Sequence, residues 1–167
     1  MKKILIALDY DPTAQKVAET GYDLAKAMNA STILLHVTSD ATRYSYLNYS
    51  TVMEFGGFSN IDMDQKDTTE ELKNAAQEYL DKSKKHLGDE TIQTVVRKGN
   101  FGETILDAAT DLKVDIIVMG THSRKGLEKI LVGSVAENVL HHSSIPILII
   151  PTKGIELINT NLQVESW

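Results

Sequence analysis

The chain contains no cysteine, which excludes disulfide bonds, zinc–thiolate sites and catalysis by a thiol. It also lacks a basic tract to offset its net charge of -6, and this acidic balance argues against a nucleic-acid partner. The apolar run near the N-terminus stops at Asp9 and is too short for a secretion signal or a membrane span. We therefore expect a cytoplasmic protein with no membrane or nucleic-acid partner.

The chain does show an alternation of short apolar runs with helical patterns. The runs are predicted to be strands covered on both faces, and they span residues 3–8, 32–37, 92–97, 116–119 and 145–150. Between them apolar residues recur at the helical period, which predicts helices that begin near Asp11 or Thr13, near Thr69, after Gly102 and at Ser134. This alternation predicts an α/β fold, with a doubly wound, open five-stranded parallel sheet and helices on both faces.

Two segments fall outside this alternation. Residues 39–66 lose all periodicity, and irregular insertions of this length are usually functional or mobile. The stretch 43–49 interleaves tyrosines with a single basic residue, so packing of the loop on the domain or on a partner subunit is favoured over stacking of nucleic acid. The segment after Lys153 shows no clear period. We expect one domain over residues 1–152 and a C-terminal tail over residues 153–167.

Two glycine-bearing loops are the most informative part of the sequence. The strand 116–119 leads into the loop 120–126, and Gly133-Ser134 opens the next helical pattern. An open parallel sheet binds ligands at the carboxyl ends of its strands. A helix N-terminus at that edge offers unpaired N–H groups and partial positive charge, both of which a phosphate satisfies. The sequence therefore predicts a site for a phosphorylated small molecule.

These loops are among several segments through which the chain resembles the universal stress proteins of the single-domain type. The resemblance runs from Lys3 to about Thr152, and its most specific parts read VMGTH at 118–122 and GSVAENVL at 133–140. Further support comes from segments 4–9, 35–37 and 146–151. The resemblance implies a Rossmann-like fold of the adenine nucleotide alpha hydrolase-like kind and a homodimer, often formed through the last strand. In one class of members it also implies bound ATP, accompanied by Mg²⁺.

For an ATP-binding member, the resemblance implies that the two loops grip the triphosphate while Asp9 and Val37 flank the nucleoside. The whole implied site consists of Ala7, Leu8, Asp9, Val37, Met119, Gly120, Ser123, Arg124, Gly133, Ser134 and Val135. Simpler interpretations stay open, since Asp9 could form a turn or cap a helix and Ser134 could cap one. The glycines could serve ordinary turns, and Arg124 could be a solvated loop charge that contributes modestly to phosphate binding.

One departure from the family pattern concerns the second glycine. ATP-binding members carry Gly, two residues, Gly, nine residues, Gly and then Ser or Thr. Here Gly120, Gly133 and Ser134 match, but Ser123 replaces the second glycine. If that position needs a positive φ, serine costs roughly 1 kcal/mol, which is several-fold in affinity. A serine hydroxyl also donates hydrogen bonds to phosphate oxygens, so ATP binding is the leading hypothesis and a dimeric interaction protein without nucleotide is the alternative.

The sequence identifies no catalytic residue. His122 lies in the first loop, but no carboxylate with an orienting role and no nucleophile can be paired with it. The P-loop pattern Gly-x-x-x-x-Gly-Lys-Ser/Thr is absent, and no general base to position water is apparent. Whether the protein is an enzyme stays open, with the pattern leaning against it, and a slow ATPase is the second alternative.

Overall fold

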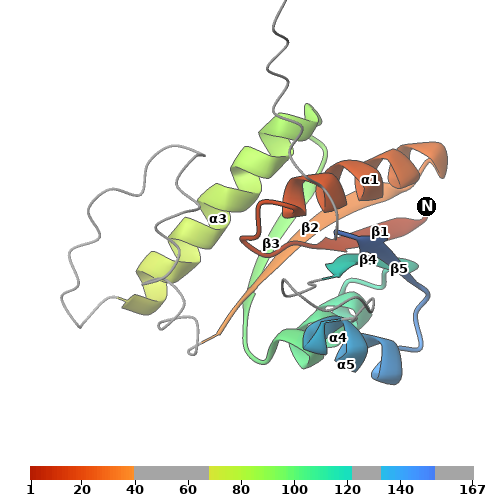
Figure 1. Ribbon diagram of the computed structural model, residues 1–167. Helices are drawn as coiled ribbons and strands as arrows, with labels where there is room; N and C mark the ends of the chain where they lie inside the picture. The colour runs from red at the N-terminus through yellow and green to blue at the C-terminus, as the bar shows by residue number, and fades with distance from the viewer. Residues whose placement is uncertain (40–67, 122–132, 153–167) are drawn as a thin grey trace, which may run out of the picture.

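The computed structural model describes residues 1–39, 68–121 and 133–152. The elements are β1 (Lys3–Ala7), α1 (Ala14–Ala27), β2 (Ser31–Thr38), α3 (Thr68–Leu87), β3 (Gln93–Lys98), α4 (Phe101–Asp111), β4 (Ile116–Thr121), α5 (Ser134–His142) and β5 (Ile147–Pro151). Five strands form one parallel sheet in the order β3-β2-β1-β4-β5 (Figure 1). The predicted doubly wound, five-stranded α/β fold is confirmed.

Helices cover both faces of the sheet, as Figure 1 shows. Along β1 the side chains of Ile4 and Ile6 pack in one core with residues of α1 and α3. Leu5, between them, packs in the other core with residues of α4 and α5. A strand buried on both faces needs apolar residues at every position rather than at alternate ones, which explains the continuous apolar run that begins the sequence.

Helix α1 lies close to the centre of the sheet. A β-carbon at Gly21 would stand 2.8 Å from Cδ1 of Ile6 and 3.1 Å from Cγ1 of Val118. Gly21 and its neighbours on the inward face of the helix, Val17, Ala18 and Ala25, are all buried. Small residues on this face let the helix axis approach β1 and β4, so α1 packs closely on the central strand and on its neighbour.

The sequence prediction agrees with the structure at the start of α1 and differs from it, for a local reason, at the start of the last strand. Thr13 occupies the N-cap of α1 without a capping hydrogen bond from its side chain. Its hydroxyl instead donates to the Asp11 carboxylate at 2.6 Å, which also accepts the Thr13 amide at 2.8 Å. The last strand begins at Ile147 rather than at 145, because the amide and carbonyl of Ile145 both bond to the Ser143 hydroxyl, at 3.0 and 2.8 Å.

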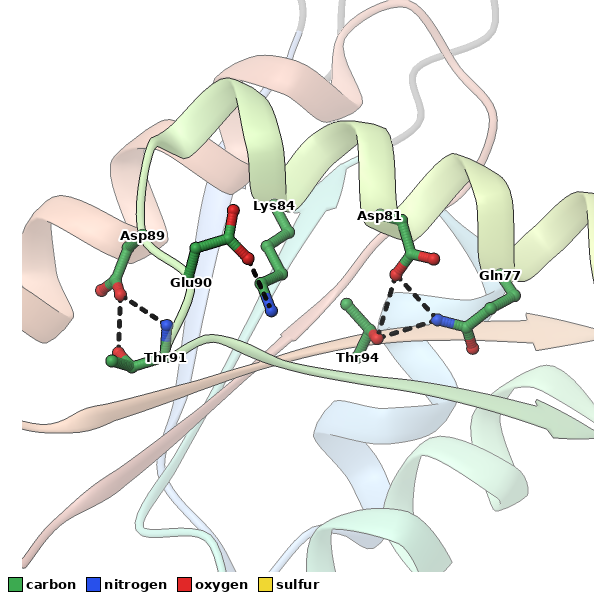
Figure 2. Close-up of polar contacts among 7 residues, drawn as sticks. All are labelled: Gln77, Asp81, Lys84, Asp89, Glu90, Thr91 and Thr94. Carbon is green, nitrogen blue, oxygen red and sulfur yellow. Dashed lines mark hydrogen bonds and ion pairs between the residues drawn. The ribbon is translucent and has the colours of Figure 1, made fainter.

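Helix α3 is held to β3 by polar groups as well as by apolar packing. Figure 2 shows Gln77 and Asp81 of α3 meeting Thr94 of β3, with the Gln77 amide 2.8 Å from the Thr94 hydroxyl. At the end of the helix Lys84 forms an ion pair with Glu90 at 3.3 Å.

Within the described residues, no helix combines the length and apolar character needed to cross a membrane.

Candidate functional site

The carboxyl edge of the sheet beside β1 is the topological switch point of this fold. Strand β1 lies between β2 and β4. Helix α1, which follows β1, packs on one face of the sheet, and α5, the next described element after β4, packs on the other. Ala7 is in register with Leu35 of β2 and with Met119 of β4. The structure therefore brings predicted site residues from the two distant segments 7–9 and 119–120 side by side, where open α/β sheets bind ligands. Two further predicted site residues, Ser123 and Arg124, lie outside the described part of the chain.

The end of β1 supplies a buried residue followed by an exposed carboxylate. Leu8 is buried, and its amide donates to the Leu35 carbonyl at 2.9 Å. Asp9 is exposed, and its Oδ1 accepts the amide of Asp11 at 3.0 Å. Asp9 thus has the turn-forming role that its residue type favours. Because a carboxylate accepts several hydrogen bonds, this turn is compatible with a contact to a ribose hydroxyl.

The backbone of Val37 faces the same edge. The Leu35 carbonyl accepts the Leu8 amide, whereas the Thr38 carbonyl accepts the amide of Gly99 on the β3 side. Backbone groups alternate in direction along a strand, so the N–H and C=O of Val37 point toward the β1 side. Between described residues, the last backbone bond that joins these two strands is the one to Leu35. The Val37 backbone is therefore directed into the space beyond the end of β1.

Gly120 has a packing role that the sequence did not reveal. A β-carbon at this position would stand 2.8 Å from Cγ2 of Val17 and 3.1 Å from Cγ2 of Thr152. Thr152 is held in place by two bonds to Thr121: its amide donates to the Thr121 hydroxyl at 3.2 Å, and its hydroxyl donates to the Thr121 carbonyl. Among the described glycines, Gly120 is not one of those with a positive φ. Close approach of α1 and Thr152 is thus a sufficient reason for glycine here.

The N-cap of α5 is Gly133, not Ser134. Gly133 has φ -57° and ψ 156°, and its carbonyl accepts the amide of Glu137 at 2.9 Å. Ser134 is the first helical residue, so its hydroxyl is one position too late to be the N-cap that the sequence left open. No hydrogen bond between described residues engages the amides of Ser134, Val135 or Ala136. Because glycine has no side chain to cap them, these first amides of α5 present donors and the positive end of the helix dipole.

Three aromatic side chains that the sequence analysis did not assign to the site lie next to the carboxyl end of β1: Tyr10, His36 and Tyr79. His36 is 4% exposed, and its Nδ1 lies 2.7 Å from the Leu8 carbonyl. The Tyr79 hydroxyl donates to the Asp9 carbonyl at 2.6 Å. The Tyr10 ring lies against both, with centroids 4.2 Å from His36 and 5.0 Å from Tyr79. The available signal was a histidine inside an apolar strand, directly before Val37.

Burial of His36 makes the stability of the fold depend on pH. Desolvation lowers the pKa of His36 below its ordinary value of 6.5, while the bond to Leu8 and the charge of Asp9 act in the opposite direction. The unfolded chain therefore binds a proton at this histidine over a pH range in which the folded chain does not. By linkage, His36 allows full stability above about pH 6.5 and removes some of it as the pH falls toward the folded-state pKa.

We expect the unfolding free energy to decrease between about pH 7.5 and about pH 5.5, by at most about 1.4 kcal/mol, because pH 5.5 lies about one unit below the unfolded-state pKa. Urea unfolding at both pH values measures this change. The control is His36→Asn, which keeps an N–H donor near the position of Nδ1 but does not titrate. An equal decrease in the variant would show that other groups cause the pH dependence.

The described residues also bear on metal binding. Among them, no group of three or more His, Cys, Asp or Glu side chains is arranged to hold a metal ion. A Mg²⁺ that accompanies a nucleotide is held largely by phosphate oxygens and water, with one or two carboxylates. Asp9 is the exposed carboxylate that the fold places at the carboxyl end of β1.

Strand order and site together define the class of protein. A parallel sheet ordered β3-β2-β1-β4-β5, with the candidate site at the carboxyl ends of β1 and β4, is a doubly wound α/β protein of the Rossmann-like type. The chain belongs to the universal stress protein family, whose sequence profile matches residues 1–151. The resemblance inferred from the two glycine loops is thereby confirmed.

Individual relatives match over nearly the whole chain. Universal stress protein MJ0577 of Methanocaldococcus jannaschii is 31% identical over 157 residues, which cover 92% of this chain and 96% of that protein. Universal stress protein MJ0531 of the same organism is 32% identical over 152 residues, covering 89% and 81%. The solved structure of MJ0577 has a TM-score of 0.65 at 29% identity, over 91% of this chain and 96% of that chain. A universal stress protein crystallised in complex with cAMP shares the fold, with a TM-score of 0.56 at 19% identity, over 89% and 95%.

Proposed function

We propose that this universal stress protein binds ATP at the carboxyl edge between β1 and β4 and acts as a nucleotide-dependent regulatory module in the stress response. The observation that carries the proposal is the start of α5. Gly133 caps the helix without a side chain, and the next three amides have no partner among the described residues. Such amides, at the positive end of a helix dipole, bind phosphate. The acidic net charge of -6 makes this local positive potential necessary for an anionic ligand.

In this proposal the site residues divide between the two ends of ATP. The nucleoside lies against Ala7, Leu8 and Asp9, and the Val37 backbone, which points beyond the end of β1, pairs with the edge of adenine. The triphosphate lies along the end of β4 and the start of α5, in contact with the residues Met119, Gly120, Ser123, Arg124, Gly133, Ser134 and Val135. Mg²⁺ accompanies the phosphates, which supply most of its ligands.

A homodimer formed through β5 is part of the same proposal. Strand β5 is at one edge of the sheet, and its Leu148 side chain is 37% exposed. An exposed apolar edge strand tends to pair with another chain. A second copy of β5 would pair with the outer backbone groups of this edge, which no described strand pairs, and would cover Leu148. ATP binding that alters the loops of the site would then be passed on through the dimer, in the cytoplasm where ATP is abundant.

The test begins with the purified protein in its native form. Denaturation, followed by chromatography and mass spectrometry of the supernatant, identifies any nucleotide that co-purifies. The nucleotide-free chain is then titrated with Mg-ATP, with cAMP as a competitor because a family member of this fold was crystallised with it. We expect a released adenine nucleotide or ATP binding in the micromolar range. Light scattering on the same sample, with a mass of twice 18.5 kDa expected, tests the dimer.

Two alternatives have distinct outcomes. If no nucleotide is released and millimolar ATP does not bind, the chain is a dimeric interaction protein, with Ser123 marking a lost phosphate site. If ATP binds and phosphate is released faster than the nucleotide dissociates, the protein is a slow ATPase. Turnover slower than dissociation supports the regulatory module.

A further inference from the structure

Two consecutive carbonyls at the end of β1 are held by side chains of other elements. His36 of β2 bonds to the Leu8 carbonyl at 2.7 Å, and Tyr79 of α3 bonds to the Asp9 carbonyl at 2.6 Å. Both bonds lie just past the point where the β1–β2 ladder ends. Beyond Leu8 the sheet no longer determines the path of the chain, so these two side chains determine where the backbone around Asp9 lies.

Ring packing adds to this restraint. The aromatic cluster of Tyr10, His36 and Tyr79 has centroid separations of 4.2, 5.0 and 5.7 Å, with the His36 and Tyr79 rings edge to face. Separations and tilts of this kind are favourable for aromatic pairs. Tyr10 directly follows Asp9, so Asp9 is bracketed by a bonded carbonyl before it and a packed ring after it, while its own carbonyl accepts the Tyr79 hydroxyl.

Both bonded side chains keep the protonation state that their bonds need. Burial lowers the pKa of His36 and raises the pKa of Tyr79. At neutral pH the Tyr79 hydroxyl therefore retains its proton and donates to Asp9. A neutral imidazole has one N–H, and the proximity of Nδ1 to the Leu8 carbonyl assigns the proton to that nitrogen.

We propose that Tyr79 is a positioning residue for the nucleotide site, whose hydroxyl fixes the peptide of Asp9 and thereby the orientation of the Asp9 carboxylate. This inference rests on the proposed function, because Tyr79 of α3 would support Asp9, a residue of the same nucleotide site. Asp9 Oδ1 is already bonded to the Asp11 amide at 3.0 Å. The carboxylate and carbonyl of Asp9 are thus both held, and the ligand meets a carboxylate whose orientation is set before binding. Preorganisation of this kind improves affinity by removing an ordering cost.

The experiment compares Tyr79→Phe with Tyr22→Phe in the full chain. The Tyr22 hydroxyl donates to Asp89 Oδ2 at 2.9 Å and joins α1 to the turn after α3. That turn precedes β3 and lies at the amino edge of the sheet, away from the site. Each variant loses one hydroxyl and one hydrogen bond between elements. We expect Tyr79→Phe to weaken Mg-ATP binding by about 5- to 10-fold. Tyr22→Phe is expected to leave the affinity within about two-fold of that of the unchanged chain. The two variants are expected to unfold at similar urea concentrations.

A second measurement works without nucleotide. In the ligand-free chain, hydrogen exchange at the Asp11 amide reports how firmly Asp9 holds its turn. We expect exchange at Asp11 to accelerate about 5- to 10-fold in Tyr79→Phe and not in Tyr22→Phe. Unchanged exchange and unchanged affinity in Tyr79→Phe would overturn the positioning role, as would equal effects of both variants. If the unchanged chain does not bind Mg-ATP while exchange responds as expected, the proposed function fails and Tyr79 orders Asp9 for some other ligand or for stability alone.

Discussion

Replacement of Gly133 by valine is expected to reduce Mg-ATP affinity by at least about 100-fold, or roughly 3 kcal/mol, without unfolding the chain. Gly133 has φ -57° and ψ 156°, a conformation that any L-residue adopts, so the backbone tolerates the change. The new side chain would stand at the N-cap of α5, beside the amides of Ser134 and Val135, and would occupy space that the proposed phosphate needs. The loss is large because the phosphate contacts are blocked together rather than one at a time.

Calorimetric titration with Mg-ATP measures the affinity of this variant, and circular dichroism measures its fold. The matched control is Asn100→Val at the N-cap of α4, where φ is -67° and ψ is 129°. Loss of the Asn100 cap, whose side chain accepts the Glu103 amide, costs about 1 kcal/mol of stability. We expect it to leave ATP binding intact. Retention of ATP binding by Gly133→Val would remove the start of α5 from the site.

Truncation of Leu80 to alanine is expected to have the largest effect on stability, about 3 kcal/mol. Leu80 and Ala76 are the fully buried apolar side chains of α3 among its described residues, and both are 0% exposed. The polar contacts of this helix with α1 and β3 are exposed or partly buried, and the contact between Gln77 and Thr94, drawn in Figure 2, is partly buried. Hydrogen bonds of that kind contribute little net stability, so they do not offset the cavity that the substitution leaves.

Urea unfolding of Leu80→Ala and of the unchanged chain measures this loss of stability. The matched control is Leu140→Ala on α5, the same substitution at a helical side chain that is 45% exposed. We expect the control to change the unfolding free energy by less than about 0.5 kcal/mol. Similar losses in both variants would indicate that α3 contributes no more to the core than a surface leucine does.

The sequence predicted a site that stays a prediction, and it did not reveal the packing role of one of the residues, Gly120. The spacing of Gly120 and Gly133 indicated phosphate loops, and the fold places the segments 7–9 and 119–120 at one edge. Gly120, however, also lies where a β-carbon would crowd the side chains of Val17 and Thr152. No local pattern announces such a contact, since these partners lie 103 and 32 positions away in the chain.

Local patterns alone determined the strands, the helices and the family of this protein. The continuous apolar run 4–6 required a strand covered on both faces, and the stripe that includes Val17 and Gly21 required a helix with one buried side. These signals depend on residues that are neighbours in the chain. Only the tertiary structure decided that Gly133 caps α5 and that Tyr79 holds the carbonyl of Asp9. Contacts across 70 residues depend on strand order, register and helix placement, which arise when the whole chain packs.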